Sequence, residues 1–278
     1  MGLFITLNII MTNILTILSY NIWFDKTMCL ERTISLCDHI NTLKADVVCL
    51  QEVRPEIYEI LIVLLGDLRY HFPKKINKEY GCVTFSRYPI SKCLDSPYPN
   101  SNMGRSLLIT KIDYPYHIIN EDGNSVDKVE IVIANSHFES LFKKNTENDA
   151  KLKQYEISRN MLEMLYNTFK NVILCSDTNV MSHEEPKFDQ QFEHNSWIDV
   201  WKIKGSNLNK FTYDSENNVY LKIKLSKFKF KSRIDRILCK TDNCFIEEFN
   251  IIKGNGSNIE PSDHFGIYGK FTIFKLDN

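Results

Sequence analysis

The sequence lacks an excess of charge of either sign. Its 278 residues carry 34 Lys and Arg against 35 Asp and Glu, a formal net charge of −1. No global positive field therefore attracts nucleic acid, and a basic surface for that purpose would have to be local. The length allows one large α/β domain or two small ones, and the 43% apolar and 25% charged content is typical of a soluble globular protein.

Cysteine pairs at metal-binding spacing are also missing. The eight cysteines include no CxxC pair, so the pattern of a zinc site or a disulfide framework is absent. Cys49, Cys175 and Cys239 lie within apolar runs, where a free cysteine behaves as a small hydrophobic residue. These features predict a reduced, intracellular chain.

The apolar N-terminus is neither a convincing signal peptide nor a membrane span. It has no cationic start and no small-residue cleavage site. Thr6, Asn8, Thr12 and Asn13 interrupt its apolar run. We therefore expect a short extension over residues 1–12, a protein that is not secreted and has no membrane partner, and a monomer.

No repeat and no linker rich in Pro, Gly or Ser divides the rest of the chain, so residues 13–278 are expected to form a single domain. Apolar runs typical of strands lie at residues 13–23, 46–53, 81–87, 105–112, 128–138, 171–177 and 265–274. Apolar residues at helical spacing occupy residues 29–44, 54–67 and 148–170, and residues 219–240 are expected to be rich in β-structure. Strands that alternate with helices and mix with hairpins predict a layered α/β domain with mixed sheets.

Polar residues stand at the ends of several predicted strands. Asp177 and Asn179 end one strand, and residues two apart on a strand point to the same face. Alone, this pair could equally form an Asx turn that closes the strand. Four other strand ends carry Asn21, Glu52, His137 with Ser140, and Asp263 with His264. Sites collect outside strand ends in α/β folds, so five such ends together indicate a functional site.

These residue types suit metal-assisted hydrolysis of a phosphate ester. Glu52 is a hard oxygen ligand for Mg²⁺, which would neutralise charge on the phosphate and the leaving group. Asp177 would accept a proton from the attacking water or orient it. Asn179 and Asn21 can donate to phosphate oxygens or hold Asp177 in place.

The two histidines complete the predicted site. His137 and His264 can donate to phosphate oxygens as charge develops, provided that an acceptor orients the second ring nitrogen. Asp235 is the candidate acceptor. The alternative is that Asp235, between Arg233 and Arg236, forms only a surface ion pair.

The order of these segments resembles the signature of the endonuclease/exonuclease/phosphatase superfamily over roughly residues 14–275. The matching segments are Asn21, LQE (50–52), SHFES (136–140), SDTN (176–179), RIDRI (233–237) and SDH (262–264). The resemblance implies a four-layer α/β sandwich of two packed mixed β-sheets flanked by helices, with the site at one end of the sheets.

The same resemblance assigns roles to individual residues. It implies Glu52 and Asp263 as ligands of Mg²⁺, for which Mn²⁺ could substitute. Asp177 becomes the acid/base residue, and His137, Ser140 and His264 surround the phosphate. The sequence departs from the family pattern at Trp23, where an aspartate that supports the metal is typical, and Asp25 is the nearest carboxylate.

Further segments resemble the tyrosyl-DNA phosphodiesterase branch of the superfamily, namely residues 97–108, 196–201 and 211–218. This resemblance implies hydrolysis of 5′-phosphotyrosyl adducts of the topoisomerase II type on DNA, or on RNA, to leave a 5′-phosphate, and hence DNA repair. Arg105 and Tyr213 are expected to contact the substrate. The alternatives are an abasic endonuclease, an RNA phosphodiesterase, a phosphatase, a sphingomyelinase-like enzyme, or a DNA-binding paralogue without activity.

A local basic segment lies at residues 220–233. If this segment were an extended hairpin, Lys222 and Lys224 would share one face, and Lys227, Lys229 and Lys231 would form a second run. Such a stripe could follow phosphates, although lysines also protect the edge strands of sheets. We expect Lys229 and Lys231 to bind the substrate.

Overall fold

The computed structural model describes residues 13–120, 123–140, 149–226, 228–254 and 259–275. The expected N-terminal extension over residues 1–12 and Lys227 lie outside the described residues. Among the described helices, none has the length and apolar character needed to cross a membrane.

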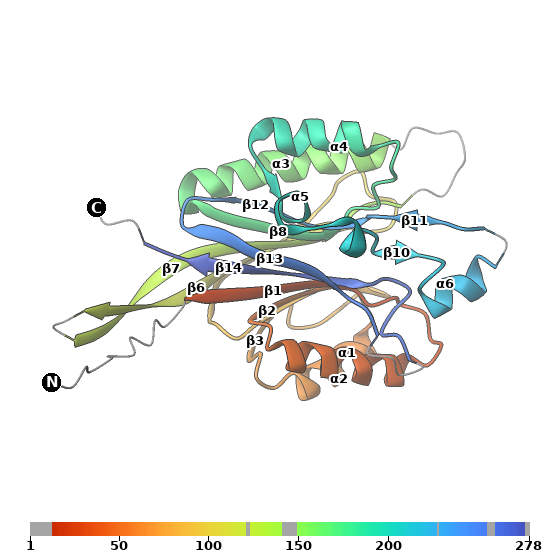
Figure 1. Cartoon of the computed structure of the whole chain (residues 1–278), viewed down its shortest axis with the longest axis horizontal. Coiled ribbons are helices and arrows are strands. Elements are labelled where there is room, and N and C mark those ends of the chain that lie inside the picture. Colours follow the sequence, from red (N-terminus) through yellow and green to blue (C-terminus); the bar gives the residue numbers. More distant parts are fainter. Residues whose placement is uncertain (1–12, 121–122, 141–148, 227, 255–258, 276–278) are drawn as a thin grey trace, which may run out of the picture.

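Two six-stranded sheets stack face to face between two pairs of helices (Figure 1). The first sheet has the order β13 (Cys244–Ile252), β14 (Gly266–Ile273), β1 (Ile14–Asn21), β2 (Val47–Val53), β4 (Gly81–Ser86) and β3 (Tyr70–Phe72). The second has the order β5 (Ile90–Pro97), β6 (Ser106–Asn120), β7 (Gly123–His137), β8 (Asn171–Asp177), β12 (Asp235–Thr241) and β9 (Ile198–Asp199). A small ribbon pairs β10 (Tyr213–Asp214) with β11 (Lys231–Ser232).

The helices cover the outer faces of both sheets. α1 (Cys29–Leu43) and α2 (Pro55–Leu64) lie on the first sheet, and α3 (Asp149–Phe169) and α4 (Glu185–Phe192) lie on the second (Figure 1). α5 (Val200–Lys204) and α6 (Val219–Lys224) are short, as are the 3₁₀ turns Glu193–Asn195 and Asn207–Asn209. The expected four-layer sandwich of two mixed sheets flanked by helices is confirmed.

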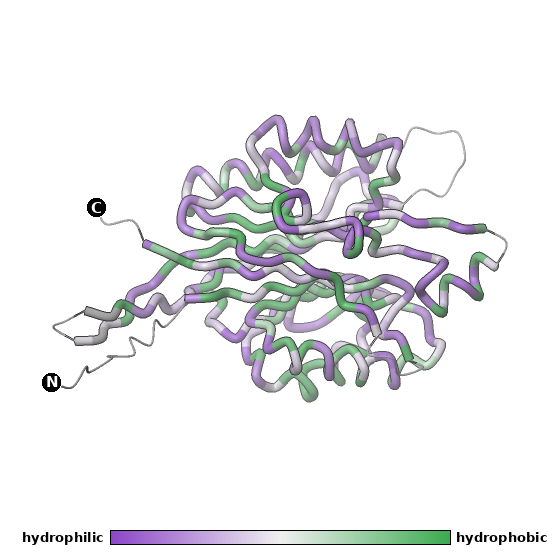
Figure 2. The backbone as a smooth tube through the Cα atoms, in the orientation of Figure 1, coloured by the Kyte–Doolittle hydropathy of each residue, from purple (hydrophilic) through white to green (hydrophobic). Residues whose placement is uncertain are grey.

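Burial on both faces explains the continuous apolar runs of the central strands. In β1, Leu15 and Ile17 pack into the cluster between the sheets, whereas Leu18 and Tyr20 pack under α1 and α2. Successive residues of a strand point to opposite faces, so both sets must be apolar. The central strands accordingly stand out as hydrophobic in Figure 2.

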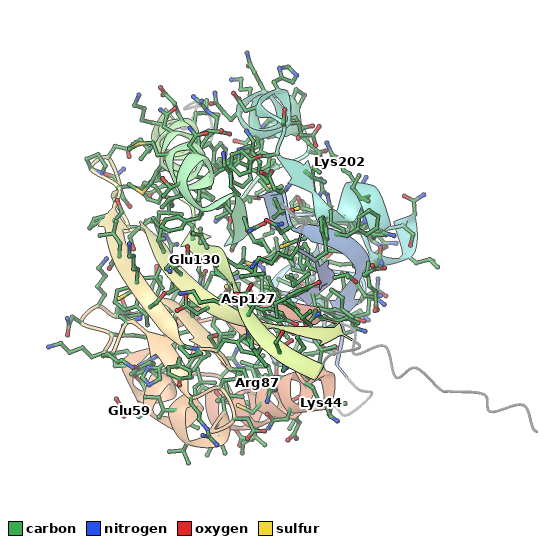
Figure 3. All side chains as sticks on the ribbon, turned by 90° about the vertical axis from the view of Figure 1, so that its left-hand side faces the viewer. Lys44, Glu59, Arg87, Asp127, Glu130 and Lys202 are labelled. Atoms are coloured by element: carbon green, nitrogen blue, oxygen red, sulfur yellow. The ribbon has the colours of Figure 1, made fainter. Side chains whose placement is uncertain are left out.

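Charged side chains cover the end of the molecule from which the β6–β7 hairpin extends. Figure 3 views this end, with Lys44, Arg87 and Glu130 around the edges of the stacked sheets. Arg87 pairs with Asp46, and Lys111 pairs with Glu130. The functional residues predicted from the sequence lie at the opposite end of the strands.

The prediction that residues 219–240 are rich in β-structure was wrong in its first part, and so was the extended hairpin considered for residues 220–233. Val219–Lys224 forms helix α6, because the Asn218 side chain caps it by accepting hydrogen bonds from the backbone N–H groups of Tyr220 and Leu221. Lys222 and Lys224 therefore do not share a strand face. β-structure returns at β11 and β12.

Candidate active site

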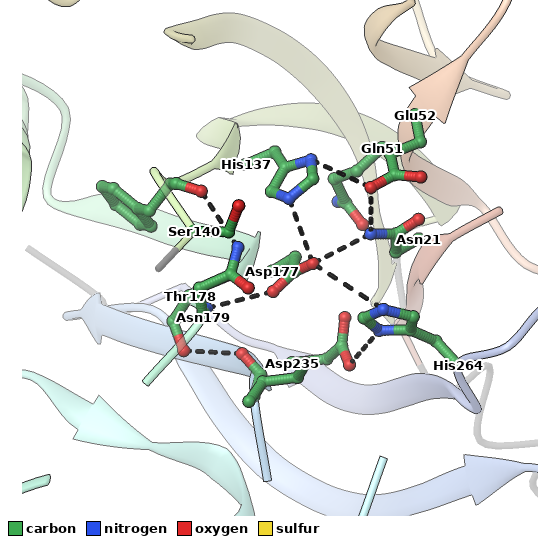
Figure 4. A network of polar contacts seen from close by, with 12 residues as sticks. Asn21, Gln51, Glu52, His137, Ser140, Asp177, Thr178, Asn179, Asp235 and His264 are labelled. Carbon is green, nitrogen blue, oxygen red and sulfur yellow. Dashed lines mark hydrogen bonds and ion pairs between the residues drawn. The ribbon is translucent and has the colours of Figure 1, made fainter. Parts of the chain in front are cut away.

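Parallel strand pairing brings the predicted polar strand ends together. β1 pairs with β2 so that Asn21 lies beside Gln51, next to Glu52, and β7 pairs with β8 so that His137 lies beside Asp177. β12 runs antiparallel to β8 and starts with Asp235 opposite Asp177. Residues that are more than 150 positions apart, such as Asn21 and Asp177, thus come into contact (Figure 4).

Asp177 lies at the centre of this cluster and is only 1% exposed. Its Oδ2 accepts a hydrogen bond from Asn21 Nδ2 at 2.8 Å and lies 3.2 Å from His137 Nε2. Burial and the neighbouring Asp235 charge raise the pKa of Asp177 to about 7. A carboxylate with that pKa is half protonated near neutral pH, which suits a general base.

The sequence SDTN forms both the Asx turn and the site. Asp177 Oδ1 accepts a hydrogen bond from the backbone N–H of Asn179 at 3.0 Å, which closes the turn. Asn179 has a left-handed φ of 51°. Its Nδ2 donates to the Phe138 carbonyl at 3.0 Å, so this amide group braces the turn against the end of β7.

His137 is held by a donor rather than by the expected acceptor. Arg105 Nη1 lies 2.7 Å from His137 Nδ1, and because a guanidinium only donates, Nδ1 must be the acceptor. The ring proton then lies on Nε2 and faces Asp177. Burial, together with the positive charges of Arg105 and His264, lowers the pKa of His137 well below its usual value, so this ring is neutral.

His264 is the histidine that Asp235 orients. Its Nδ1 lies 2.9 Å from Asp235 Oδ2, while its Nε2 lies 4.0 Å from Asp177 Oδ2. Burial alone would lower the pKa of His264, but Asp235 and Asp177 outweigh it and raise the pKa to about 10. His264 is therefore a cation at neutral pH, with Nε2 directed toward Asp177.

The alternative of a surface ion pair around Asp235 is wrong. Arg233 and Arg236 bind Asp199 and Glu185 instead.

A cleft of about 800 Å³ opens over these strand ends. Nine of the predicted site residues line it: Glu52, Arg105, His137, Ser140, Asp177, Asn179, Tyr213, Asp263 and His264. Asn21 and Asp235 are buried behind this surface and bind Asp177 and His264. The ring of Tyr213 lies 5.0 Å from that of His264.

Lys229 and Lys231 are outside the set of residues that line the cleft. Lys229 pairs with Glu216 at 2.9 Å, and Lys231 pairs with Glu216 at 2.5 Å and approaches Asp214. That these two lysines bind the substrate stays a prediction, which the lining of the cleft does not support. From the same segment, Lys224 at the end of α6 does line the cleft, 3.6 Å from Asp263.

Two groups of acidic residues could hold a divalent cation. Glu52 and Asp263 both line the cleft, and burial together with the Asp263 charge raises the pKa of Glu52. Glu52 already accepts hydrogen bonds from the backbone N–H of Phe24 and from Asn21 Nδ2. A carboxylate whose charge is disfavoured by burial and by a second acidic residue at the wall of the cleft fits a hard cation.

The second group consists of Asp177, Asp235 and His264, whose ligand atoms lie within 4.8 Å of one another. Their polar atoms already bind one another and Asn21, and a positively charged imidazole is not a metal ligand. The Glu52–Asp263 pair is therefore the better fit for a cation.

Aromatic residues that were not predicted as site residues also line the cleft, and they include Trp23, where the sequence departs from the family pattern. Trp23 packs against Tyr220 with ring centroids 5.0 Å apart, and Phe24 stacks on Tyr80 at 4.6 Å. Asp25 also lines the cleft, but its Oδ1 accepts a hydrogen bond from the backbone N–H of Thr27. Their positions depend on loops whose conformation has no sequence signal as clear as the strand ends.

The chain belongs to the Endonuclease/Exonuclease/phosphatase family, which matches residues 18–264. Within this class of proteins it is similar to tyrosyl-DNA phosphodiesterase 2. It shares 26% identity with the Xenopus tropicalis protein over 273 residues, which cover 92% of this chain and 65% of that protein. With the Homo sapiens protein it shares 26% identity, covering 85% of this chain and 62% of that protein. The chain thus spans somewhat less than two thirds of the length of these relatives.

Solved structures share the fold. Truncated Caenorhabditis elegans TDP2 superposes with a TM-score of 0.73 at 18% identity, covering 93% of this chain and 98% of that chain. D. rerio TDP2 complexed with single-strand DNA product gives 0.75 at 20% identity, covering 93% and 99%.

Proposed function

We propose that this protein is a divalent-metal-dependent phosphodiesterase that hydrolyses 5′-phosphotyrosyl adducts of the topoisomerase II type on DNA and leaves a 5′-phosphate. The observation that carries the proposal is the placement of Asp177 between Asn21 and His137 on the wall of the cleft, with the Asp235–His264 pair beside it. Similarity to proteins named tyrosyl-DNA phosphodiesterase 2 supports the choice of substrate. DNA repair is the process that such a reaction would serve.

Different residues of the cleft would carry out different steps of the proposed reaction. Asp177 accepts a proton from a water whose oxygen forms the new bond to phosphorus, while the bond between phosphorus and the tyrosyl oxygen breaks. His264, as a cation, donates to a non-bridging phosphate oxygen on which charge develops. Mg²⁺ at Glu52 and Asp263, or Mn²⁺ in its place, would supply positive charge for the phosphate and the leaving phenolate.

A second cavity beside the cleft fits an aromatic leaving group. It has a volume of about 160 Å³ and shares Glu52, Tyr80, Arg105 and His137 with the cleft, whereas Asp177 lines only the larger space. A cavity of about 150 Å³ is enough for benzene. The shared residues place this ring-sized cavity next to the cleft that Asp177 lines, which supports an aryl ester as the substrate.

We further propose that the protein acts as an intracellular monomer. RNA adducts are a possible second substrate in the same cleft, because Tyr213 can stack on either kind of nucleotide.

The proposal is tested with an oligonucleotide that carries a 5′-phosphotyrosyl peptide, in Mg²⁺, in Mn²⁺ and in chelator. We expect metal-dependent release of the peptide and a 5′-phosphate product. Asp177→Asn should lower kcat by about 10²–10⁴-fold. Asp67→Asn, on an exposed loop at α2, is the matched control and should retain activity.

Other outcomes would assign a different function. Turnover of abasic DNA, RNA, phosphomonoesters or sphingomyelin in place of the tyrosyl substrate would favour another activity of the family. DNA binding without turnover of any substrate would instead indicate a paralogue that only binds.

A further inference from the structure

Lys151 on α3 is a fully buried lysine, with 0% of its surface exposed. Lysine is almost never fully buried unless its charge is paired. Its Nζ donates to the backbone carbonyl of Asn179 at 2.8 Å and to Glu184 Oε2 at 2.6 Å. The buried ammonium group therefore lies directly behind the turn that follows Asp177.

Helix α3 holds this turn at two consecutive carbonyl groups. The Tyr155 hydroxyl, one helical turn after Lys151, donates to the Thr178 carbonyl at 2.6 Å. Lys151 binds the next carbonyl, that of Asn179. Glu184 Oε2 accepts the hydrogen bond from Lys151, and it also accepts one from the backbone N–H of Met181 at 2.9 Å. The turn is thus fixed to the helix at Thr178 and at Asn179.

The Asn179 peptide needs this support because its conformation is uncommon. A φ of 51° is left-handed, and although asparagine tolerates it better than most residues, it persists only where the surroundings impose it. The backbone N–H of this same residue binds Asp177 Oδ1 at 3.0 Å. A rotation of the turn would consequently rotate the Asp177 carboxylate away from Asn21 and His137.

We propose that Lys151 is a positioning residue for the hydrolytic reaction: it fixes the Asn179 carbonyl, and through the backbone of that residue it sets the orientation of the Asp177 carboxylate. The inference rests on the proposed function of Asp177 as the base. Lys151 does not line the cleft, so it acts through the turn and not on the substrate.

The test compares four variants on thymidine 5′-(p-nitrophenyl phosphate), a small phosphodiester with an aryl leaving group. In Lys151→Met the turn loses its hydrogen bond to residue 151 and keeps the one to Tyr155. We expect kcat to fall about 10–100-fold while KM changes less than about threefold, because displacing a reacting group by roughly 1 Å is enough for such losses. Lys151→Arg keeps the charge and the donors and should recover part of this loss.

Two control variants separate positioning from stability. Glu184→Gln weakens the ion pair but leaves the Lys151–Asn179 bond, so it should lower the melting temperature while kcat stays within about threefold of wild type. Lys153→Met removes an exposed lysine of the same helix, paired with Glu156, and should change neither quantity.

Unchanged kcat in Lys151→Met would overturn the inference. It would also be overturned if Lys151→Met and Glu184→Gln lost kcat in the same proportion to their loss of melting temperature. These results differ from failure of the proposed function, which would appear as a wild-type protein that turns over neither this ester nor the tyrosyl oligonucleotide. That last result would overturn both proposals.

Discussion

At the scale of single residues, the two histidines of the cleft carry different charges because their neighbours differ. His137 accepts from Arg105 and is neutral, whereas His264 binds Asp235 and is a cation. The reaction requires an ionised Asp177 and a protonated His264. We therefore expect kcat to rise with pH through about 7, where Asp177 loses its proton, and to fall near pH 10, where His264 loses its proton. A pH–rate profile at saturating metal measures both limbs. An acidic limb near the ordinary pKa of aspartate would contradict the conclusion that the surroundings of Asp177 raise its pKa.

The Asp235→Asn variant separates these two limbs from unrelated ionisations. The Asp235 charge raises the pKa values of both Asp177 and His264. Its removal should therefore shift the acidic and the alkaline limbs to lower pH together. We expect kcat to fall as well, by about 10²-fold or more, because a neutral amide replaces the charged acceptor that orients His264. Asp189→Asn, whose carboxylate pairs with Lys202 outside the cleft, should leave the profile unchanged.

At the scale of elements, Arg32 of α1 fixes the loop that forms one wall of the cleft. Its guanidinium donates to the backbone carbonyls of five residues: Ile22, Trp23, Asp25, Thr27 and Pro261. It also lies over the Trp23 ring at 4.5 Å. Arg32→Met should lower the free energy of unfolding by about 2–4 kcal/mol, because buried carbonyls lose their donors. Urea denaturation of this variant measures the loss, with the exposed Arg69→Met as control. A change below about 0.5 kcal/mol would show that water replaces the guanidinium.

Elements were predictable where packing imposes a pattern on both faces. The buried strands β1, β2, β7 and β8 and the amphipathic helices α1, α2 and α3 follow their apolar residues closely. α6 was not predicted, because alternating Lys and apolar residues suggest a strand and only the cap at Asn218 favours a helix. α4, β5 and β13 were not predicted either. β5 is largely exposed at the edge of its sheet, so it has little apolar pattern.

At the scale of the whole molecule, the location of the site was predictable from the sequence, but which of its side chains bind each other was not. Polar residues at strand ends mark the edge where β1, β2, β7 and β8 finish, and sequence order alone suggests that these ends meet. Which histidine binds Asp235 depends on how β12 aligns with β8 and on the loop before β14. That alignment involves residues far apart in sequence. The contact between His137 and Arg105, which lines the cleft as expected, was not predicted for the same reason.

The stability of the whole domain should depend on the cation because Glu52, which is half-buried, lines the cleft together with Asp263. Burial raises the pKa of Glu52 above that of the unfolded chain, so its ionisation disfavours the folded state, and this cost grows as the pH rises above the pKa of the unfolded chain. A cation bound only by the folded state offsets it and stabilises by about 2.7 kcal/mol at 100 times its Kd. Wild-type melting temperature should therefore rise with Mg²⁺ and fall in chelator.

Glu52→Gln removes both the unfavourable free energy of ionising Glu52 in the folded state and the carboxylate that would bind the cation. In chelator at pH 8 we expect it to melt at or above the wild-type temperature, because a neutral amide replaces the buried charge. In Mg²⁺ its melting temperature should rise much less than that of the wild type. Glu79 is an exposed carboxylate that lines the same cleft, and Glu79→Gln should show the full wild-type rise in melting temperature. A Glu52→Gln protein that responds fully to Mg²⁺ would move the cation to the group formed by Asp177, Asp235 and His264. Differential scanning fluorimetry across a Mg²⁺ titration distinguishes these two positions without an activity assay.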